Sequence, residues 1–286
     1  MIRKKIIIGI ISLLMVSGCT VKHEKRDDSS AKQTDISQVE HKEKKYKSFG
    51  YFIGLRHVSS LKGHYHRIVI DARYFTSKEI SSLRDYSNEI YSYISVGTLS
   101  KSDKDYSKYK TLTNGQYQSD PNTYRMKVSK KKWRKYIYKL AKKAKKKGVD
   151  GVVLDHFDIY TSDKQVKRYK YLKKIVKNIN MPICIFNGDR FMSKYLGEGL
   201  TKVSDVGETH MFTTFNESTG KTTKQKSSIS SSLKDYLEVC KNKNLGIYVV
   251  ECTRNNDWIA VIKAYCKSHD YYYYISPTLK YNVEKK

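Results

Sequence analysis

The 286-residue sequence lacks the short motifs that mark several classes of enzyme. No GxGxxG segment follows any early strand candidate, which argues against a dinucleotide-binding sheet. No HExxH segment, pair of spaced metal histidines or motif for a nucleophilic Ser, Cys or His occurs either. Gly220–Lys221–Thr222 resembles the end of a phosphate-binding loop, but Phe215 stands where the first glycine should be. We therefore expect no cofactor and no metal.

Long apolar runs are also scarce, and the only one is Ile6–Val16. It is too short to cross a bilayer of roughly 30 Å at 1.5 Å per residue. Basic residues precede it, and Val16–Cys19 follows as a bacterial lipobox. The sequence predicts a lipoprotein signal peptide over 1–18 and lipidation of Cys19, with a simple signal peptide that happens to end in cysteine as the alternative. The mature protein would then be anchored to the extracellular face of the cell membrane.

Residues 19–48 contain one aromatic residue, Tyr46, among many Lys, Glu, Asp, Ser and Gln residues. Such a segment buries too little apolar surface to offset its ordering entropy, so we expect a flexible tether. Residues 49–286 remain, a length usual for one α/β barrel domain. The four cysteines in this domain lack metal-ligand spacing, and we expect them in the core; a Cys240–Cys266 disulfide is the alternative in an oxidising compartment.

Acidic residues are few: 28 Asp and Glu stand against 56 Lys and Arg, a formal net charge of +28. The densest basic segment, Lys127–Lys147, contains 12 basic residues and no acid. Its apolar residues recur at helical spacing, which favours a helix with a solvated lysine face, capped by Ser129 and ended by Gly148. The alternative is a binding site for anionic cell-wall polymers or lipid. No nucleic-acid motif occurs, so we expect no nucleic-acid partner.

Short apolar runs alternate with amphipathic helical segments from residue 49 onward. The predicted strands are Gly50–Leu55, Arg67–Asp71, Ile90–Val96, Gly151–Leu154, Pro182–Phe186, Asp205–Glu208, Gly246–Glu251 and Tyr271–Ser276. The predicted helices are Ser77–Tyr86, Ser129–Lys147, Lys164–Asn178, Arg190–Leu200, Ser228–Lys243 and Asn256–Ser268. Eight strands joined mainly by helices indicate an α/β fold, a (β/α)8 TIM barrel, with an open doubly wound sheet as the alternative. Two long connections, Thr98–Val128 and Thr209–Ser227, are expected at the C-terminal rim, where barrels place their active sites.

Acids or an amide follow the ends of five of the predicted strands. These residues are Asp71, Asp155 with nearby Asp158, Asn187, Glu208 and Glu251. Any one of them alone can be a helix cap, but several at one rim indicate a site. Two close carboxylates whose pKa values differ can supply an acid and a base, and glycoside hydrolysis requires that pair.

The strand ends resemble those of the endo-α-1,4-polygalactosaminidase-like glycoside hydrolases. The similarity is carried by Tyr93–Gly97 (YISVG), Gly148–Asp155 (GVDGVVLD), Phe186–Gly188 (FNG) and Glu208. The resemblance implies a (β/α)8 barrel, a catalytic pair formed by Asp155 and Glu208, and a sugar-binding cleft. It implies that Asp71, Asp158 and Asn187 line that cleft.

Two positions depart from the family pattern. Thr98 stands where the family usually has an acid, and Glu251–Cys252 replaces an Asp-Tyr pair. We take Glu251 as a further substrate-binding residue. The resemblance implies a hydrolase of a galactosamine-containing or related exopolysaccharide, which the predicted lipid anchor would hold at the membrane, although a protein this basic repels a cationic polymer at long range. A non-catalytic glycan-binding barrel and a polyanion-binding surface lipoprotein are the alternatives.

Overall fold

Most of the predicted barrel domain is described by the computed structural model, which covers residues 48–117, 120–160 and 166–282. The predicted signal peptide, the lipidation site Cys19 and all of the predicted tether except Ser48 lie outside these residues. Within the described residues, none of the helices has the length and apolar character needed to span a membrane.

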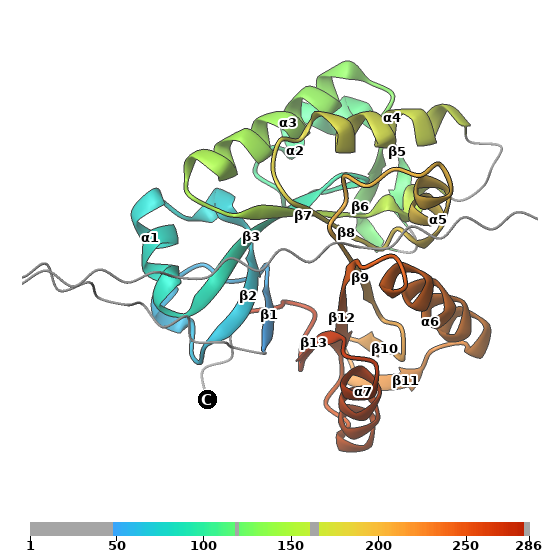
Figure 1. Cartoon of the computed structure of the whole chain (residues 1–286). Coiled ribbons are helices and arrows are strands. Elements are labelled where there is room, and N and C mark those ends of the chain that lie inside the picture. The colour runs from blue at the N-terminus through green and yellow to red at the C-terminus, as the bar shows by residue number, and fades with distance from the viewer. Residues whose placement is uncertain (1–47, 118–119, 161–165, 283–286) are drawn as a thin grey trace, which may run out of the picture. The chain divides into compact units, whose positions relative to one another are not determined.

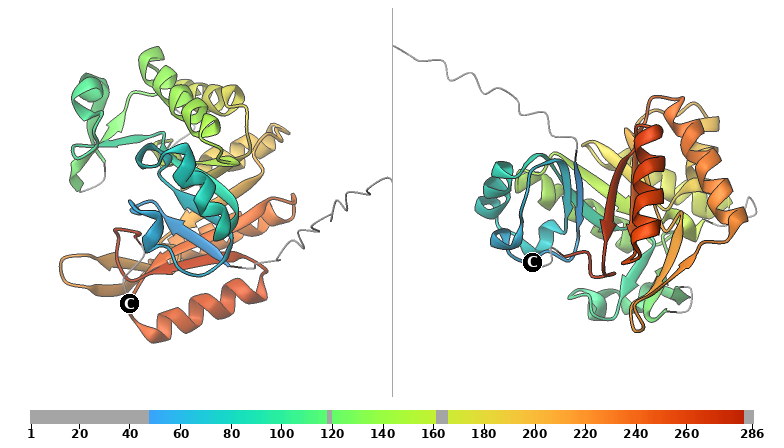
Figure 2. Two further views of the ribbon diagram at one scale, coloured as in Figure 1. Left: turned by 90° about the vertical axis from the view of Figure 1, so that its left-hand side faces the viewer. Right: turned by 90° about the horizontal axis from the view of Figure 1, so that it is seen from below.

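Eight strands form one parallel sheet, in which each strand is hydrogen-bonded to the next of these eight in chain order (Figure 1). They are β1 (Phe49–Phe52), β2 (Tyr65–Ile70), β3 (Ser87–Ser95), β7 (Gly151–Asp155), β8 (Ile183–Phe186), β9 (Asp205–Thr209), β12 (Gly246–Cys252) and β13 (Tyr272–Ser276). The order is β1-β2-β3-β7-β8-β9-β12-β13. All eight predicted strands are confirmed, and the sheet curves with its helices on the outside (Figure 2).

The first and last strands meet through side chains and loops rather than through a ladder of hydrogen bonds. The rings of Phe52 and Tyr274 lie 5.1 Å apart. The backbone N–H of Gly54 donates to the carbonyl of Tyr281 at 3.0 Å. The barrel is therefore nearly closed.

Helices follow six of the strands and cover the outer face of the sheet. They are α1 (Ser77–Ser82), α3 (Lys131–Lys146), α4 (Val166–Asn178), α5 (Asp189–Gly197), α6 (Ser227–Lys241) and α7 (Asn256–Ser268). The link from β1 to β2 has only a 3-10 turn, Val58–Ser60, because it is too short for a helix. The N-cap of α3 is Lys130 and not Ser129 as expected, and its side chain makes no capping bond. Gly148, at φ +95°, follows the helix in the left-handed conformation that favours glycine.

Both long connections leave the C-terminal ends of strands and contain secondary structure. After β3, the chain forms a small antiparallel sheet of β4 (Thr98–Ser100), β5 (Thr113–Tyr117) and β6 (Asp120–Met126), with the short helix α2 (Tyr106–Tyr109). After β9, it forms the hairpin of β10 (Thr213–Asn216) and β11 (Lys221–Lys224). The glycine of the phosphate-loop-like segment, Gly220, lies in the turn of this hairpin.

Two apolar layers lie on opposite faces of the sheet because side chains alternate along each strand. The inner layer includes Tyr51, Val69, Val153, Phe186 and Val250. The outer layer packs alternate strand residues against the helices, and each large buried side chain contributes about 1.5–3 kcal/mol. Cys184, Cys240, Cys252 and Cys266 are all buried and free, which confirms core packing in place of a disulfide.

Candidate active site

Asp155 ends β7 on the inner face of the sheet. Val153, two residues earlier, packs in the inner layer, so alternation directs the Asp155 side chain inward at the C-terminal rim. Its parallel partner in β3 is Ser95. Immediately after the strand, His156 adopts a left-handed conformation at φ 63°, and the chain then turns into the 3-10 helix Phe157–Ile159. This turn separates Asp155 from Asp158.

The carboxylate of Asp155 is held by hydrogen bonds and is only 4 % exposed. Its Oδ1 accepts from the backbone N–H of His156 at 2.5 Å and from Nδ2 of Asn187 at 2.7 Å. Burial, and then the charge of Asp155, raise the pKa values of Tyr51 and Tyr93 well above their usual range. Two neutral phenols thus flank this carboxylate.

His156 joins Asp155 to the β3 end of the rim. Its Nδ1 lies 3.6 Å from Asp155 Oδ2, 3.2 Å from the hydroxyl of Ser95 and 3.4 Å from that of Tyr93. The Ser95 hydroxyl also lies 2.8 Å from that of Thr98, the residue at the first departure from the family pattern. Sequence patterns predict no role for His156, because the left-handed backbone that brings its ring beside Asp155 is seen only in the structure.

Asn187 bridges β7 and β9. In addition to its bond to Asp155, its Oδ1 accepts from the backbone N–H of Thr209 at 3.1 Å and from the Thr209 hydroxyl at 2.9 Å. Its own N–H donates to the carbonyl of Gly207 at 3.0 Å. Asn187 therefore lies in the rim, as expected, where it fixes the position of Asp155.

Glu208 lies on the other face of β9 from the cleft. Its neighbour Gly207 faces inward, since a Cβ there would lie 2.3 Å from the Phe186 ring, and Glu208 is paired in register with Val249 of the outer layer. The backbone N–H of Gly188 donates to Glu208 Oε1 at 3.3 Å, and the carboxyl is only 3 % exposed. Asp155 and Glu208 therefore do not face each other across the rim as expected, because consecutive strand residues point to opposite faces.

Burial holds the pKa of Glu208 well above its usual range. The charge of Asp189 raises it further and those of Asp155 and Asp158 add to this, while the Gly188 hydrogen bond opposes the shift. The Glu208 charge in turn contributes to raising the pKa values of Tyr236 and Cys240 in α6, after burial in each case. Glu208 is thus a buried acid with a raised pKa, situated between the sheet and its helices.

Asp158 lies in the turn after β7 and carries one unpartnered oxygen. Its Oδ2 accepts from the Tyr117 hydroxyl at 2.5 Å, whereas its buried Oδ1 has no hydrogen-bond partner among the residues that the structure describes. Burial raises the pKa of Asp158, and the charge of His156 and the Tyr117 bond oppose that shift. Tyr117 belongs to the segment between β3 and α3 that forms β4, β5 and β6, which we call the β4–β6 excursion. This segment thus contacts the active-site rim through Tyr117.

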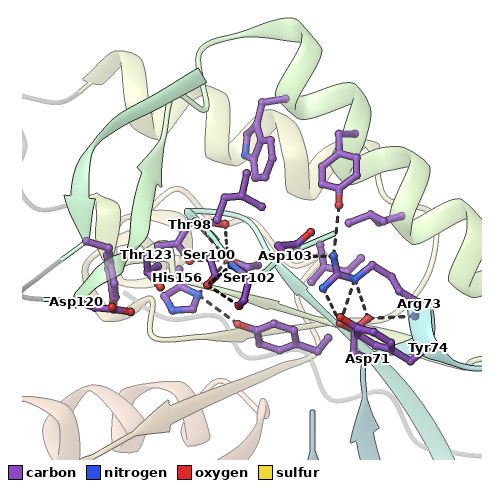
Figure 3. A pocket seen from close by; sticks show the side chains of 18 of the residues that line it. Asp71, Arg73, Tyr74, Thr98, Ser100, Ser102, Asp103, Asp120, Thr123 and His156 are labelled. Atoms are coloured by element: carbon purple, nitrogen blue, oxygen red, sulfur yellow. Dashed lines mark hydrogen bonds and ion pairs between the residues drawn. The ribbon is translucent and has the colours of Figure 1, made fainter. Parts of the chain in front are cut away.

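Asp71 is directed into the cleft but is already ion-paired. The guanidinium of Arg73 contacts both of its oxygens, with a shortest distance of 2.6 Å, and Arg73 also binds Asp103 at 2.6 Å. Figure 3 shows Arg73 between these two carboxylates, with His156 across the pocket. Asp71 therefore contributes to the cleft wall with its charge largely compensated.

Glu251 has no oxygen facing solvent. It points to the outer face from β12, is fully buried, and accepts from the backbone N–H groups of Phe212 and Thr213 at 2.7 and 3.2 Å. The Thr213 hydroxyl donates to it at 2.7 Å. Burial raises the pKa of Glu251 to about 7, although these bonds oppose the shift. We assign Glu251 to holding the start of the β10–β11 hairpin and not to binding sugar.

His210 is a second histidine near Asp155 that the sequence did not single out. It follows β9 in a left-handed conformation at φ 59°, and its Nδ1 is buried without a hydrogen-bond partner. Burial lowers the pKa of His210, while a hydrogen bond to the Thr213 backbone and the charge of Asp155 oppose the shift. A neutral imidazole therefore lies at the same rim.

A pocket of about 430 Å³ opens between these groups and the β4–β6 excursion. Asp71, Tyr93, Ser95 and His156 line it from the barrel, and Asp103, Tyr117, Asp120 and Thr123 line it from the excursion (Figure 3). Across the described parts of the chain, no group of three or more His, Cys, Asp or Glu residues is arranged to hold a metal ion. The pocket offers carboxylates, hydroxyls and aromatic rings, which suit a polar ligand with many hydroxyls.

Comparisons with known proteins agree with this architecture. A model of glycoside-hydrolase family GH114 matches residues 29–270. The glycoside hydrolase domain of PelA from Pseudomonas aeruginosa superimposes with a TM-score of 0.70 at 15% identity, covering 82% of this chain and 96% of that one. Aspergillus fumigatus Ega3, solved in complex with galactosamine, gives a TM-score of 0.63 at 15% identity, covering 83% and 93%. No curated protein matches this chain.

Proposed function

Because this chain belongs to glycoside-hydrolase family GH114, we propose that its cleft hydrolyses a galactosamine-containing exopolysaccharide, with Asp155 as the reacting carboxylate. The observation that carries the proposal is Asp155 itself, an inward-facing acid at the C-terminal rim, oriented by Asn187 and His156 beside a pocket of about 430 Å³. The galactosamine unit is suggested by the sugar bound to Ega3.

Glycoside hydrolysis needs a second group that protonates the leaving oxygen. We assign this role to Glu208, since its raised pKa favours the protonated carboxyl that a proton donor needs. Its carboxyl accepts from the Gly188 N–H at 3.3 Å and faces away from the cleft, so the proposed role requires the Glu208 side chain to turn toward the sugar when the substrate binds. Asp155 then acts as the nucleophile or as the base for an attacking water.

The cleft also reconciles a basic protein with a cationic sugar. The formal net charge is +28, but the acids at the rim include Asp120, Asp155 and Asp158. The basic exterior is screened within roughly 10 Å at ordinary salt. The unpartnered Oδ1 of Asp158 is a suitable acceptor for a sugar ammonium or hydroxyl group.

The decisive experiment measures new reducing ends released from a partly deacetylated galactosamine polymer by the chain from residue 20 onward. Asp155→Asn and Glu208→Gln are each expected to lower the rate by about 10³-fold or more. Glu251→Gln is the matched control, because it neutralises another buried, outward-facing glutamate that ends the adjacent strand. Folding of each variant is checked by its thermal unfolding midpoint.

The outcomes separate the candidate roles. Full activity in Asp155→Asn excludes the reaction that we propose. Full activity in Glu208→Gln excludes Glu208 as the proton donor. A parent protein that binds the polymer without cutting it is a glycan-binding barrel instead.

The membrane anchor is a separate part of the proposal. We propose that the chain is lipidated at Cys19 and held on the outer face of the cell membrane, because a basic segment, an apolar run and a lipobox stand in order at residues 3–19. Cells that express the parent should incorporate labelled palmitate into the protein and retain it in the membrane fraction. Cys19→Ser should release it, and retention of that variant would remove the anchor from the proposal.

A further inference from the structure

A second pocket, of about 370 Å³, lies behind the wall of the cleft and is lined by lysines. They come from α3 and from the start of the β4–β6 excursion: Lys104, Lys108, Lys139, Lys143, Lys146 and Lys147. Arg73 and Tyr136 line both this pocket and the cleft, so the two share a wall. We refer to it as the lysine pocket.

The lining of the lysine pocket contains more positive than negative charge, although the charges of Asp71 and Glu79 act to raise the pKa of Lys147. No ion pair of these six lysines occurs among the described residues. The single carboxylate in the lining of this pocket, that of Asp105, accepts a hydrogen bond from Tyr136 at 2.7 Å. Arg73 is already paired with Asp71 and Asp103. Six ammonium groups therefore surround a concave surface with a single acid.

Lys147 lies close to other lysines of the pocket. Lys147 donates to the carbonyls of Ala72 and Phe75 at 2.7 and 2.5 Å, which fixes its ammonium at the edge of the pocket. Burial, and then the charges of Lys104 and Lys143, lower its pKa. An anion in the pocket would relieve this repulsion. A solvated lysine face on a straight helix would place its charges apart, whereas here two segments distant in sequence bring them together.

The geometry points to a binding site for a phosphodiester polymer, separate from the sugar cleft. Lysine ammonium groups are hydrated point charges that suit phosphate oxygens, whereas bidentate carboxylate recognition favours arginine. The floor of the pocket contains Ile94, Leu140 and Ala144, so it can contact the carbon backbone of such a polymer. The proposal that the lysine pocket binds such a polymer does not require that the cleft hydrolyse a polysaccharide.

Binding is measured by titrating soluble poly(glycerol phosphate) into the chain from residue 20 onward, which retains every described residue. The pocket variant carries Lys104→Gln, Lys139→Gln and Lys143→Gln. The control variant carries Lys131→Gln, Lys135→Gln and Lys142→Gln, which remove the same charge from exposed positions of α3 outside the pocket. All six side chains are exposed, so both variants should keep the parent's thermal unfolding midpoint. Lys147 is left intact because its bonds hold neighbouring loops.

The pocket variant should bind the polymer at least about tenfold more weakly than the parent, and the control variant less than about threefold more weakly. Equal losses in the two variants would show attraction by net charge alone and would overturn the site. A lack of binding by the parent would overturn it also.

A second arm replaces the polymer with vesicles that contain phosphatidylglycerol in phosphatidylcholine. If the vesicles bind through the lysine pocket while the soluble polymer does not, the phosphate comes from lipid headgroups and the polymer assignment is wrong. Polymer binding that depends on the pocket, with weaker or pocket-independent vesicle binding, supports the assignment. Cleavage of the galactosamine polymer should be the same in both variants.

Discussion

The acids at the strand ends fall into two groups that differ in the face of the sheet from which they project. Asp71 and Asp155 point inward, lie at the cleft and are oriented by polar side chains. Glu208 and Glu251 point outward, are covered by loops and have raised pKa values because they are buried. Acids at equivalent ends of neighbouring strands thus have different roles, decided by a single residue of alternation.

The strongest test of the inward group is Arg73→Gln. Arg73 compensates Asp71 and Asp103 with its side chain only 21% exposed, so its loss leaves two partly buried carboxylates unpaired. We expect the free energy of unfolding to fall by about 3 to 4 kcal/mol, measured by chemical denaturation. Arg73→Lys keeps the positive charge but lacks the planar guanidinium that contacts both carboxylates. It should lower the free energy of unfolding by less than Arg73→Gln does. A change below about 1 kcal/mol for Gln would mean that solvent already compensates these acids.

The outward group is tested by the pH dependence of stability in Glu251→Gln. The pKa of Glu251 is about 7 in the folded protein and near 4.5 when unfolded, so the folded state binds the proton more tightly. Its contribution to stability is therefore full below pH 4.5 and is lost as pH rises to 7, by about 3 kcal/mol. The variant, which has no charge to bury, should lose less stability between pH 4.5 and pH 8. Parallel curves for the two proteins would contradict the raised pKa.

The orientation of the inward acid is tested by Asn187→Gly. Glycine tolerates the φ of 51° found at this position but removes the amide that holds Asp155. We expect kcat for polymer cleavage to fall by about 10- to 100-fold with little change in KM, because a misplaced carboxylate slows the chemical step. Asn178→Ala, on the exposed surface of α4, is the control. A change confined to KM would make Asn187 a substrate-binding residue instead.

The smallest expected effect concerns Tyr117→Phe. This variant removes the hydroxyl that donates to Asp158, and the pKa of Asp158 should rise further because that bond favours its charged form. KM should increase about threefold. Tyr138→Phe, which loses a hydroxyl bonded to the Lys174 carbonyl outside the cleft, should leave KM unchanged. Equal kinetics for the two variants would remove Asp158 from the list of substrate contacts.

Much of the fold could be predicted from the sequence because it depends on local patterns. Apolar runs such as Gly151–Leu154 identified the strands, and helical spacing in Asn256–Ser268 identified α7 at its observed bounds. The errors were local in origin. Ser129 is a good capping residue, yet α3 starts one residue later than a Ser129 cap requires. The small sheet β4–β6 was not predicted, since its short strands have little apolar alternation.

The sequence by itself determined that this protein has eight strands joined mainly by helices, with acids or an amide at five strand ends, and that Asp155 stands at the end of a buried strand. Only the tertiary structure decided that Glu208 and Glu251 project away from the cleft, that His156 lines it, and that lysines distant in sequence share one pocket. The physical reason is that the face of a side chain is set by strand register and by individual left-handed residues. Such features leave residue type unchanged and are fixed only when strands pair.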